Sequence, residues 1–572
     1  MEHYYSNDIN AQLIVSLLKS HGISKVVASP GVTDMAVVGS MQIDPFFEMY
    51  SCVDERGAAY MACGLASESQ QPVAIVCTEA TASRNYMPAL TEAFYRQLPI
   101  VVLTGTHSRR NTGHLFTQSI DRTNTPNDIV RCSVFLDEIK DDSDRKHNAF
   151  ECSRALLELN HHGSGPVHVN FVANGAKGFT TKTLPAIPSL KRYVSNKMLP
   201  EIPSGKIVIF SGSSMYMSKE EVEAIDSFCA CYDSVVLCDH TSGYHGSYSV
   251  CSSLICSQYH HKTAASNADL LIHIGEVSGD TYSVSVLKPQ TVWRVNPDGK
   301  AKNLFGTLDS IFEMNIYDFF KYYSSLACLE PNKKKTIFLN ELTSEYNSLI
   351  IDMPDMGFGN IFLAQSFAPS MPEGCAMHFA IFNSFRSWSF FGLDSSIECT
   401  ANVGGFGIDG ATSTALGASL ANPKRLHFLV TGDLAFFYDM NAIGSRHVMP
   451  NLRIILVNNG RGVEFRKKDN PGHLLGDDAD LYVAAAGHYG KMSSSLVKHY
   501  VTDLGFEYLS ASTMEELLNV KYHFLTSEMT EKPMFLEIFP DYHDDVDNID
   551  EVRGIQKTIN DSVKDFVKKI IK

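Results

Sequence analysis

The chain has 572 residues, of which 44% are hydrophobic and 20% are charged, and its formal net charge is −16. This length is too great for one hydrophobic core and predicts about three domains. The acidic balance argues against nucleic acid as a general partner, and no apolar run approaches the ~18 residues of a membrane span.

Two features of the chain predict its compartment. The amino terminus lacks the basic and apolar regions of a signal peptide. Thirteen cysteines in a large chain without an export signal are typical of reduced thiols. We therefore expect a cytoplasmic protein with no membrane partner.

The first third of the chain alternates short apolar strands with helices. A strand at Lys25–Ser29 runs into Pro30-Gly31, and a second strand ends shortly before Glu55. A helix rich in small residues follows at 56–66, and further strands are predicted at 72–77 and 99–104. This alternation predicts a parallel, doubly wound sheet. Glu55 then lies beyond the carboxyl end of a strand, where active residues of such sheets gather.

The middle of the chain repeats this plan. A proline-rich stretch at 184–203 predicts a linker. Further strands are predicted at 206–210, 234–239, 268–275 and 291–295. We interpret Gly275-Glu-Val-Ser-Gly279 as a turn at a strand end rather than as a nucleotide-binding loop.

The most informative pattern lies in the last third. An apolar run at 427–431 ends in Gly432-Asp433, and a second run at Leu452–Val457 ends in Asn458-Asn459. The spacing of about 26 residues leaves room for a helix and a crossover between neighbouring parallel strands. A carboxylate and an amide oxygen brought together there form a site that suits Mg²⁺. The alternative is an aspartate that caps a helix and an asparagine pair in a tight turn.

Together these patterns predict an α/β fold with three doubly wound parallel-sheet domains. The predicted domains span residues 1–184, 204–325 and 336–540, and a tail follows at 541–572. The tail passes through an acidic run, Asp541–Asp550, and then places apolar residues at helical spacing. We expect it to form a docked amphipathic helix rather than a membrane anchor.

The same segments resemble thiamin-diphosphate (ThDP) enzymes, whose metal and diphosphate motif begins Gly-Asp and closes on Asn-Asn. Within that group the chain is similar to the family of SEPHCHC synthases (2-succinyl-5-enolpyruvyl-6-hydroxy-3-cyclohexene-1-carboxylate synthases) of menaquinone biosynthesis. The likeness rests on Ser29–Gly31, Val53–Arg56, Asn85–Ala89, Leu103-Thr104, Gln118–Asp121, Asn402–Gly410 and Gly432–Leu434.

The resemblance implies a pyrimidine-binding first domain, a central domain and a diphosphate-binding third domain. Glu55 would be the catalytic glutamate, which hydrogen-bonds the aminopyrimidine and favours its imino tautomer. Its alternative role is a carboxylate at a helix N-terminus. Mg²⁺ would be held by Asp433, Asn459 and the carbonyl of Arg461. Ile408 would be the apolar wedge that bends the cofactor, with an ordinary core isoleucine as its alternative.

The remaining implied cofactor-binding residues are Asn85, Ser384, Gly407, Gly432 and Leu434. In the resembling family the first and third domains of different subunits complete each site. The resemblance therefore implies a homodimer or a homotetramer.

Several arginines that the synthase family uses to bind carboxylates are missing here. Their places are taken by Val32-Thr33, His107, Val403 and Trp388, although Arg386 lies close by. The loss of about four charge-assisted contacts predicts weak binding of substrates with several carboxylates. The candidate substrate residues are Thr33, His107, Gln118, Arg386 and Trp388. Trp388 offers a stacking face, and core packing is its alternative.

We therefore predict an enzyme that uses ThDP and Mg²⁺ to decarboxylate a 2-oxo acid. The acyl carbanion passes to an acceptor unlike isochorismate, or is protonated. One alternative is SEPHCHC synthase itself. Another is a ThDP-binding subunit without turnover, which the unusual turn at Thr78–Thr81 keeps open. The presence of Glu55 together with Asp433 and Asn459 argues against that last alternative.

Overall fold

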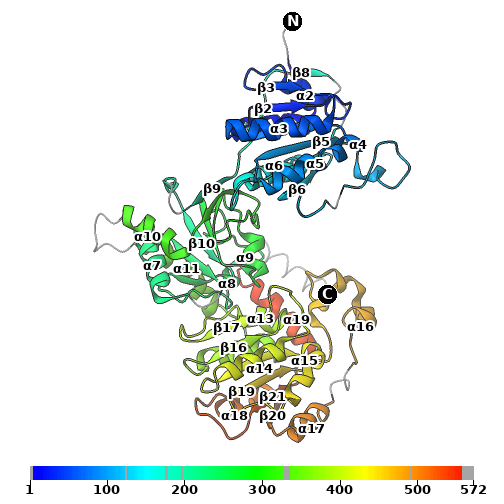
Figure 1. The fold of residues 1–572 in the computed structure, drawn as a ribbon. Coiled ribbons are helices and arrows are strands. Elements are labelled where there is room, and N and C mark those ends of the chain that lie inside the picture. Colours follow the sequence, from blue (N-terminus) through cyan, green and yellow to red (C-terminus); the bar gives the residue numbers. More distant parts are fainter. Residues whose placement is uncertain are drawn as a thin grey trace, which may run out of the picture. The chain divides into compact units, whose positions relative to one another are not determined.

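The computed structural model of the chain describes residues 4–122, 125–173, 178–194, 198–214, 217–327, 335–488 and 493–556. The chain divides into two compact units, whose elements are traced in Figure 1. The first unit holds the residues up to 194, with 299–301 and 309–311, and the second unit holds the rest. Within the described stretches, no helix is both long enough and apolar enough to cross a membrane.

The first unit is built around a six-stranded sheet of parallel neighbours, in the order β3-β2-β4-β5-β7-β6. Its strands are β2 (Lys25–Ala28), β3 (Glu48–Ser51), β4 (Val73–Cys77), β5 (Ile100–Thr106), β6 (Cys132–Leu136) and β7 (Val167–Val172). The chain moves outward from β2 in one direction and from β4 in the other, so the β2–β4 boundary is the switch point of a doubly wound sheet. The strands predicted in this region are confirmed.

Helices cover both faces of this sheet. They are α1 (Ile9–Ser20), α2 (Met35–Met41), α3 (Glu55–Ser69), α4 (Thr81–Asn85), α5 (Met87–Tyr95) and α6 (Asp142–Leu157). Successive strand residues enter different cores: Val26 belongs to the cluster under α1, α2 and α6, whereas Val27 belongs to the cluster under α3 and α5. Because both faces are buried at the centre of the sheet, β4 reads as an unbroken apolar run. Short strands β1 (Tyr5–Ser6) and β8 (Phe179–Thr181) pair antiparallel, and β9 (Lys191–Val194) ends the unit.

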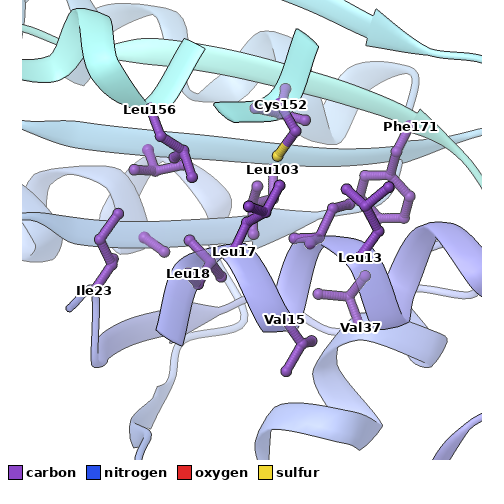
Figure 2. Packing of buried hydrophobic residues seen from close by; sticks show 14 of the residues in the cluster. Leu13, Val15, Leu17, Leu18, Ile23, Val37, Leu103, Cys152, Leu156 and Phe171 are labelled. Atoms are coloured by element: carbon purple, nitrogen blue, oxygen red, sulfur yellow. The ribbon is translucent and has the colours of Figure 1, made fainter. Parts of the chain in front are cut away.

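The core beneath α1 is drawn in Figure 2. Leu13 and Leu17 of α1 point toward Leu103 of β5 and Phe171 of β7, and all four side chains are at most 1% exposed. Removing part of such a side chain leaves a cavity that the packed surroundings cannot fill. This cluster therefore anchors α1 to the sheet.

Replacing Leu17 by alanine is expected to lower the free energy of unfolding of the first unit by about 2–5 kcal/mol. The measurement is urea unfolding followed by circular dichroism. Leu115→Ala is the matched control, because Leu115 is fully exposed. Equal unfolding midpoints for the two variants would show that α1 does not depend on this core.

The second unit contains two sheets. The first runs in the order β12-β11-β10-β13-β14 and continues through β15. Its strands are β10 (Ile207–Ser211), β11 (Val235–Cys238), β12 (Ser249–Cys251), β13 (Leu270–Ile274), β14 (Thr291–Val295) and β15 (Leu308–Glu313), of which residues 309–311 are grouped with the first unit. The pairs whose register is defined are all parallel, which confirms the predicted middle sheet.

At the switch point of this sheet, between β10 and β13, the backbone segments that follow the two strands lie in direct contact. The amide of Glu276 donates to the carbonyl of Ser213 at 2.7 Å. A Cβ on Gly212 would lie 2.1 Å from the carbonyl oxygen of Glu276, and Gly275 adopts φ +74°. The Gly275–Gly279 segment is thus a tight turn at a strand end, as predicted.

The third sheet has the order β17-β16-β18-β19-β21-β20, again with parallel neighbours. Its strands are β16 (Ala376–Phe379), β17 (Glu398–Ala401), β18 (His427–Gly432), β19 (Leu452–Val457), β20 (Glu507–Ala511) and β21 (Met534–Ile538). Counted along the chain, this order matches that of the first sheet. The switch point therefore lies between β16 and β18.

The second unit also contains helices. They are α7 (Lys219–Tyr232), α8 (Ser252–Ser257), α9 (Thr281–Val286), α10 (Ile316–Ala327), α11 (Ile337–Ile351), α12 (Asn360–Phe367), α13 (Asn383–Trp388), α14 (Ala411–Ala421), α15 (Asp433–Asp439), α16 (Ala479–Tyr482), α17 (Leu496–Asp503), α18 (Met514–Phe524) and α19 (Tyr542–Arg553).

Each main sheet lies largely inside one predicted domain range, and the domain boundaries themselves stay predictions. The tail differs from the prediction, which placed a helix only after the acidic run. The acidic run is itself helical, since it forms most of α19. The helix predicted beyond it, at 557–572, lies outside the described residues.

Candidate active site

Glu55 is the first residue of α3 and follows the carboxyl end of β3. Asp54 caps this helix by accepting a hydrogen bond from the amide of Arg56 at 3.1 Å. The cap fixes the start of the helix, and with it the position of Glu55. The Glu55 side chain is half-buried. Asn85, at the end of α4, donates from Nδ2 to Glu55 Oε2 at 3.1 Å. Two predicted residues that are 30 positions apart thus meet.

The predicted substrate residues of the first unit differ in their burial and in the contacts that they make within the chain. Thr33 is buried and donates to the carbonyl of Gly105 at 2.7 Å. The imidazole and the amide of His107 both contact the buried carboxylate of Glu79. Gln118 is exposed and adopts φ +65°. Glu79, the unusual residue of the Thr78–Thr81 turn, is therefore part of a side-chain network.

Asp34, immediately before α2, is a buried carboxylate whose Oδ2 has no hydrogen-bond partner within the described part of the chain. Burial raises its pKa to about 6, against weaker opposition from backbone N–H groups. Because this pKa is raised on folding, the stability that protonation contributes is complete below about pH 4. It is lost as the pH rises through about 6.

Asp34→Asn is therefore expected to be more stable than the parent by about 1–3 kcal/mol at pH 7.5 and nearly equal to it at pH 4. Urea unfolding at both pH values measures the difference. Asp503→Asn, at an exposed aspartate, serves as the control. A difference that does not change between the two pH values would contradict the expectation.

In the second unit, a cavity of about 370 Å³ lies at the carboxyl ends of β16, β18 and β19. Its lining includes every residue of this unit that was predicted to bind cofactor or metal: Ser384, Gly407, Ile408, Gly432, Asp433, Leu434, Asn459 and Arg461. The cavity thus occupies the switch point of the third sheet.

The sheet register explains how the two halves of the metal motif meet. Gly432, the last residue of β18, pairs with Val457, the last residue of β19. Asp433 then begins α15, and Asn459 follows β19 by two residues. The predicted crossover between neighbouring parallel strands is confirmed.

Asp433 and Asn459 are each 6% exposed. Burial raises the pKa of Asp433 to about 7, although the amide of Leu434 donates to its Oδ1 at 2.8 Å. Asn459 donates from Nδ2 to Asp545 Oδ2 at 2.9 Å. The carbonyl of Arg461 accepts from the amide of Val463 at 3.0 Å and keeps a second lone pair.

An aromatic pair that the sequence did not reveal borders the cavity. The rings of Phe382 and Phe406 meet edge to face with centroids 5.3 Å apart. Both residues have positive φ: Phe382, which precedes α13, adopts φ 64° and ψ −129°, and Phe406 adopts φ 52°. Such conformations cost free energy in residues other than glycine, and they cluster at functional sites.

The two predicted substrate residues on α13 are not free to bind a ligand. Arg386 Nη1 donates to Glu464 Oε2 at 2.5 Å, and the side chain of Arg386 is only 13% exposed. Trp388 is fully buried, with its ring 5.7 Å from that of Phe379. The stacking role predicted for Trp388 is not supported, because its ring packs in the core. Glu464, which lines the cavity, was missed because nothing local marks it as the partner of Arg386.

Comparison with known proteins bears on this arrangement. Residues 10–125 match the family described as "Thiamine pyrophosphate enzyme, N-terminal TPP binding domain". Over 563 residues the chain is 29% identical to 2-succinyl-5-enolpyruvyl-6-hydroxy-3-cyclohexene-1-carboxylate synthase of Bacteroides thetaiotaomicron, covering 95% of this chain and 97% of that protein. The enzymes of the same name from Phocaeicola vulgatus and Flavobacterium johnsoniae are also 29% identical, over 95% and 94% of this chain.

Residues 10–125 belong to the thiamine pyrophosphate enzyme family. The matched region contains Glu55 and Asn85, and the full-length likeness spans the cavity of the second unit.

The polar residues at this cavity fit a divalent cation. Within the described residues, Asp433 and Asp545 are buried carboxylates that form no ion pair with Lys, Arg or His. The Oδ1 atom of Asn360, which lines the cavity with Asp433, is buried and has no hydrogen-bond partner among the described residues. Uncompensated buried charge and an unsatisfied acceptor are costly, and a divalent cation satisfies both.

Proposed function

We propose that this ThDP enzyme decarboxylates a 2-oxo acid and passes the acyl carbanion to an acceptor unlike isochorismate, or protonates it. The observation that carries the proposal is the cavity at the ends of β16, β18 and β19, which gathers the residues expected to bind cofactor and metal. Glu55, which accepts a hydrogen bond from Asn85 on the first unit, supplies the acid–base group that this chemistry needs.

The residues of the cavity have distinct roles in this proposal. Asp433, Asn459 and the carbonyl of Arg461 hold Mg²⁺, which takes oxygen ligands and keeps waters or phosphate oxygens in its shell. Ser384 and Gly432 border the cofactor, and the half-buried Ile408 presents an apolar surface to it. When bound, ThDP supplies the electron sink for loss of CO₂ from a 2-oxo acid.

Glu55 holds and moves a proton at the pyrimidine end of the cofactor, and Asn85 orients its carboxylate. This role needs a dry setting, because water competes for the carboxylate. In a single chain Glu55 is only half-buried, and Tyr60 and Met61 farther along α3 are 47% and 38% exposed. We propose that a second copy of the chain covers this surface, so that the working enzyme is at least a homodimer.

The charges near the cavity support a less acidic acceptor. Arg386 is already paired with Glu464, and Lys467 lies 3.3 Å from the same carboxylate. A substrate carboxylate would have to displace Glu464 to gain either cation. Thr33, at another position that the synthase family fills with arginine, is buried and hydrogen-bonded. A second candidate function is SEPHCHC synthase activity itself, because relatives of that name match nearly the whole chain.

The twelve cysteines in the described stretches are free thiols. Free thiols in this number are typical of a reducing compartment. We propose that the enzyme works in the cytoplasm.

The test is CO₂ release from pyruvate, 2-oxoglutarate, oxaloacetate and a branched-chain 2-oxo acid, each with ThDP and Mg²⁺. Release by the parent protein is expected for at least one acid, and the preferred acid identifies the donor. Rapid consumption of 2-oxoglutarate only when isochorismate is present would instead establish SEPHCHC synthase activity. Cofactor binding without release from any acid would contradict the proposed reaction.

A further inference from the structure

We propose that Asp545 is a positioning residue of the cation site. It turns the carboxamide oxygens of Asn360 and Asn459 toward the cation, so that Asn360 becomes a further oxygen ligand. Neither Asp545 nor Asn360 belongs to the Gly-Asp and Asn-Asn motif. The inference rests on the cation site of the proposed function and adds two residues to it.

A single carboxylate holds both amides. Asp545 Oδ1 accepts from the backbone amide of Asn360 at 2.7 Å and from its Nδ2 at 3.0 Å. Asp545 Oδ2 accepts from Asn459 Nδ2 at 2.9 Å. Both oxygens of Asp545 are therefore used on residues that line one cavity.

This contact fixes which way each amide faces. A carboxylate only accepts hydrogen bonds, so the NH₂ group of each asparagine must point at Asp545 and its oxygen must point away. Asn459 Oδ1 receives one long hydrogen bond, from the amide of Arg461 at 3.4 Å. Asn360 Oδ1 has no partner within the described chain, although Asn360 is only 4% exposed.

A buried acceptor without a partner at the edge of a cavity indicates a ligand that satisfies it. The cavity also contains the buried carboxylate of Asp433, and neither Asp433 nor Asp545 has a cationic side chain as an ion-pair partner among the described residues. Buried charge is normally paired or bound to metal. Carboxylate and amide oxygens are the ligands that Mg²⁺ prefers, so a divalent cation is the ligand that satisfies this set.

The backbone before α12 packs closely against the carboxylate of Asp545. A Cβ on Gly359 would lie 2.5 Å from Asp545 Oδ1, so only glycine lets the chain before α12 approach so closely. Asn548, one turn later on α19, accepts from the amide of Gly357 and donates to its carbonyl, both at 2.8 Å. Asn548 thus docks α19 on this loop through hydrogen bonds to Gly357 rather than to either cavity amide.

Asp545 contacts the two cavity amides, whereas Asn548 contacts Gly357, so variants of the two residues can separate cation binding from helix docking. Mg²⁺ binding to the full chain, stripped of metal and saturated with ThDP, is measured by isothermal titration calorimetry. The test variants are Asp545→Asn and Asn360→Ala. Asp547→Asn makes the same change at an exposed position of α19, and Asn548→Ala loosens the docking of α19 alone.

We expect Asp545→Asn to weaken Mg²⁺ binding by roughly 10- to 100-fold, as the loss of orienting groups around metal ligands usually does. Asn360→Ala should weaken it by about 10-fold, and Asp547→Asn should not change it. Asn548→Ala should lower the melting temperature with little effect on Mg²⁺ affinity.

Two results would overturn the inference. One is an Asp545→Asn affinity within about twofold of that of Asp547→Asn. The other is equal weakening by Asp545→Asn and Asn548→Ala, which would reduce Asp545 to a docking residue. Parent protein that binds ThDP and Mg²⁺ but decarboxylates nothing would instead contradict the proposed reaction and leave this inference standing.

Discussion

Glu55→Gln is expected to lower the rate of CO₂ release by roughly 10²–10⁴-fold, the usual contribution of a positioned acid–base group. Glutamine keeps the shape of the side chain and can still contact Asn85, but it cannot hold or release the proton. Affinity for ThDP should therefore stay within a few fold of the parent. Turnover on the preferred 2-oxo acid and calorimetric binding of ThDP measure the two quantities separately.

The matched control is Glu68→Gln, which changes an exposed glutamate on the same helix. It should leave both turnover and binding unchanged. If Glu55→Gln retains most of the activity, Glu55 is an ordinary carboxylate at a helix N-terminus, and the catalytic base must be sought elsewhere.

Asp433→Asn is expected to weaken the joint binding of Mg²⁺ and ThDP by at least roughly 10- to 100-fold, because the cation loses its charged ligand. The effect on the cation-free protein should have the opposite sign. Asparagine fits the buried position without the cost of burying a charge, so the melting temperature in the presence of a chelator should rise by about a few degrees.

Calorimetry and thermal unfolding with and without a chelator test both effects. Asp503→Asn, at an exposed aspartate of the same unit, should change neither. Unchanged cofactor binding in Asp433→Asn would remove the Gly-Asp motif from the metal site. A drop in cation-free stability would show that the carboxylate serves the fold rather than the cation.

Much of the fold could be predicted because its strands are buried on both faces. The run Leu452–Val457 became β19 with the predicted bounds, and Thr291–Val295 became β14. Fully buried parallel strands are continuous apolar runs bounded by turns, so their ends are marked in the sequence. The acidic run at Asp541–Asp550 carried no such mark, and its helix was not foreseen.

The site could be predicted where its residues follow strand ends. Asp433 and Asn459 were found in this way, since parallel strands bring their carboxyl ends to one edge. Asp545 was missed because a buried aspartate within an acidic run looks like its exposed neighbours. The pairing of Arg386 with Glu464 was missed because it joins positions 78 residues apart. Local pattern shows where a chain turns, but it does not show which distant polar side chains become partners.

The half-buried position of Glu55 in a single chain has a consequence for how much enzyme a cell must make. If a second chain supplies the cover that Glu55 needs, the active species forms by association, and its fraction follows mass action. Activity per chain should then stay constant at high protein concentration and fall on dilution below the dissociation constant of the dimer. The amount of active enzyme would thus rise more steeply than the amount of protein. In a cell that makes little of this chain, most chains would be monomers and the rate of the reaction would be very low.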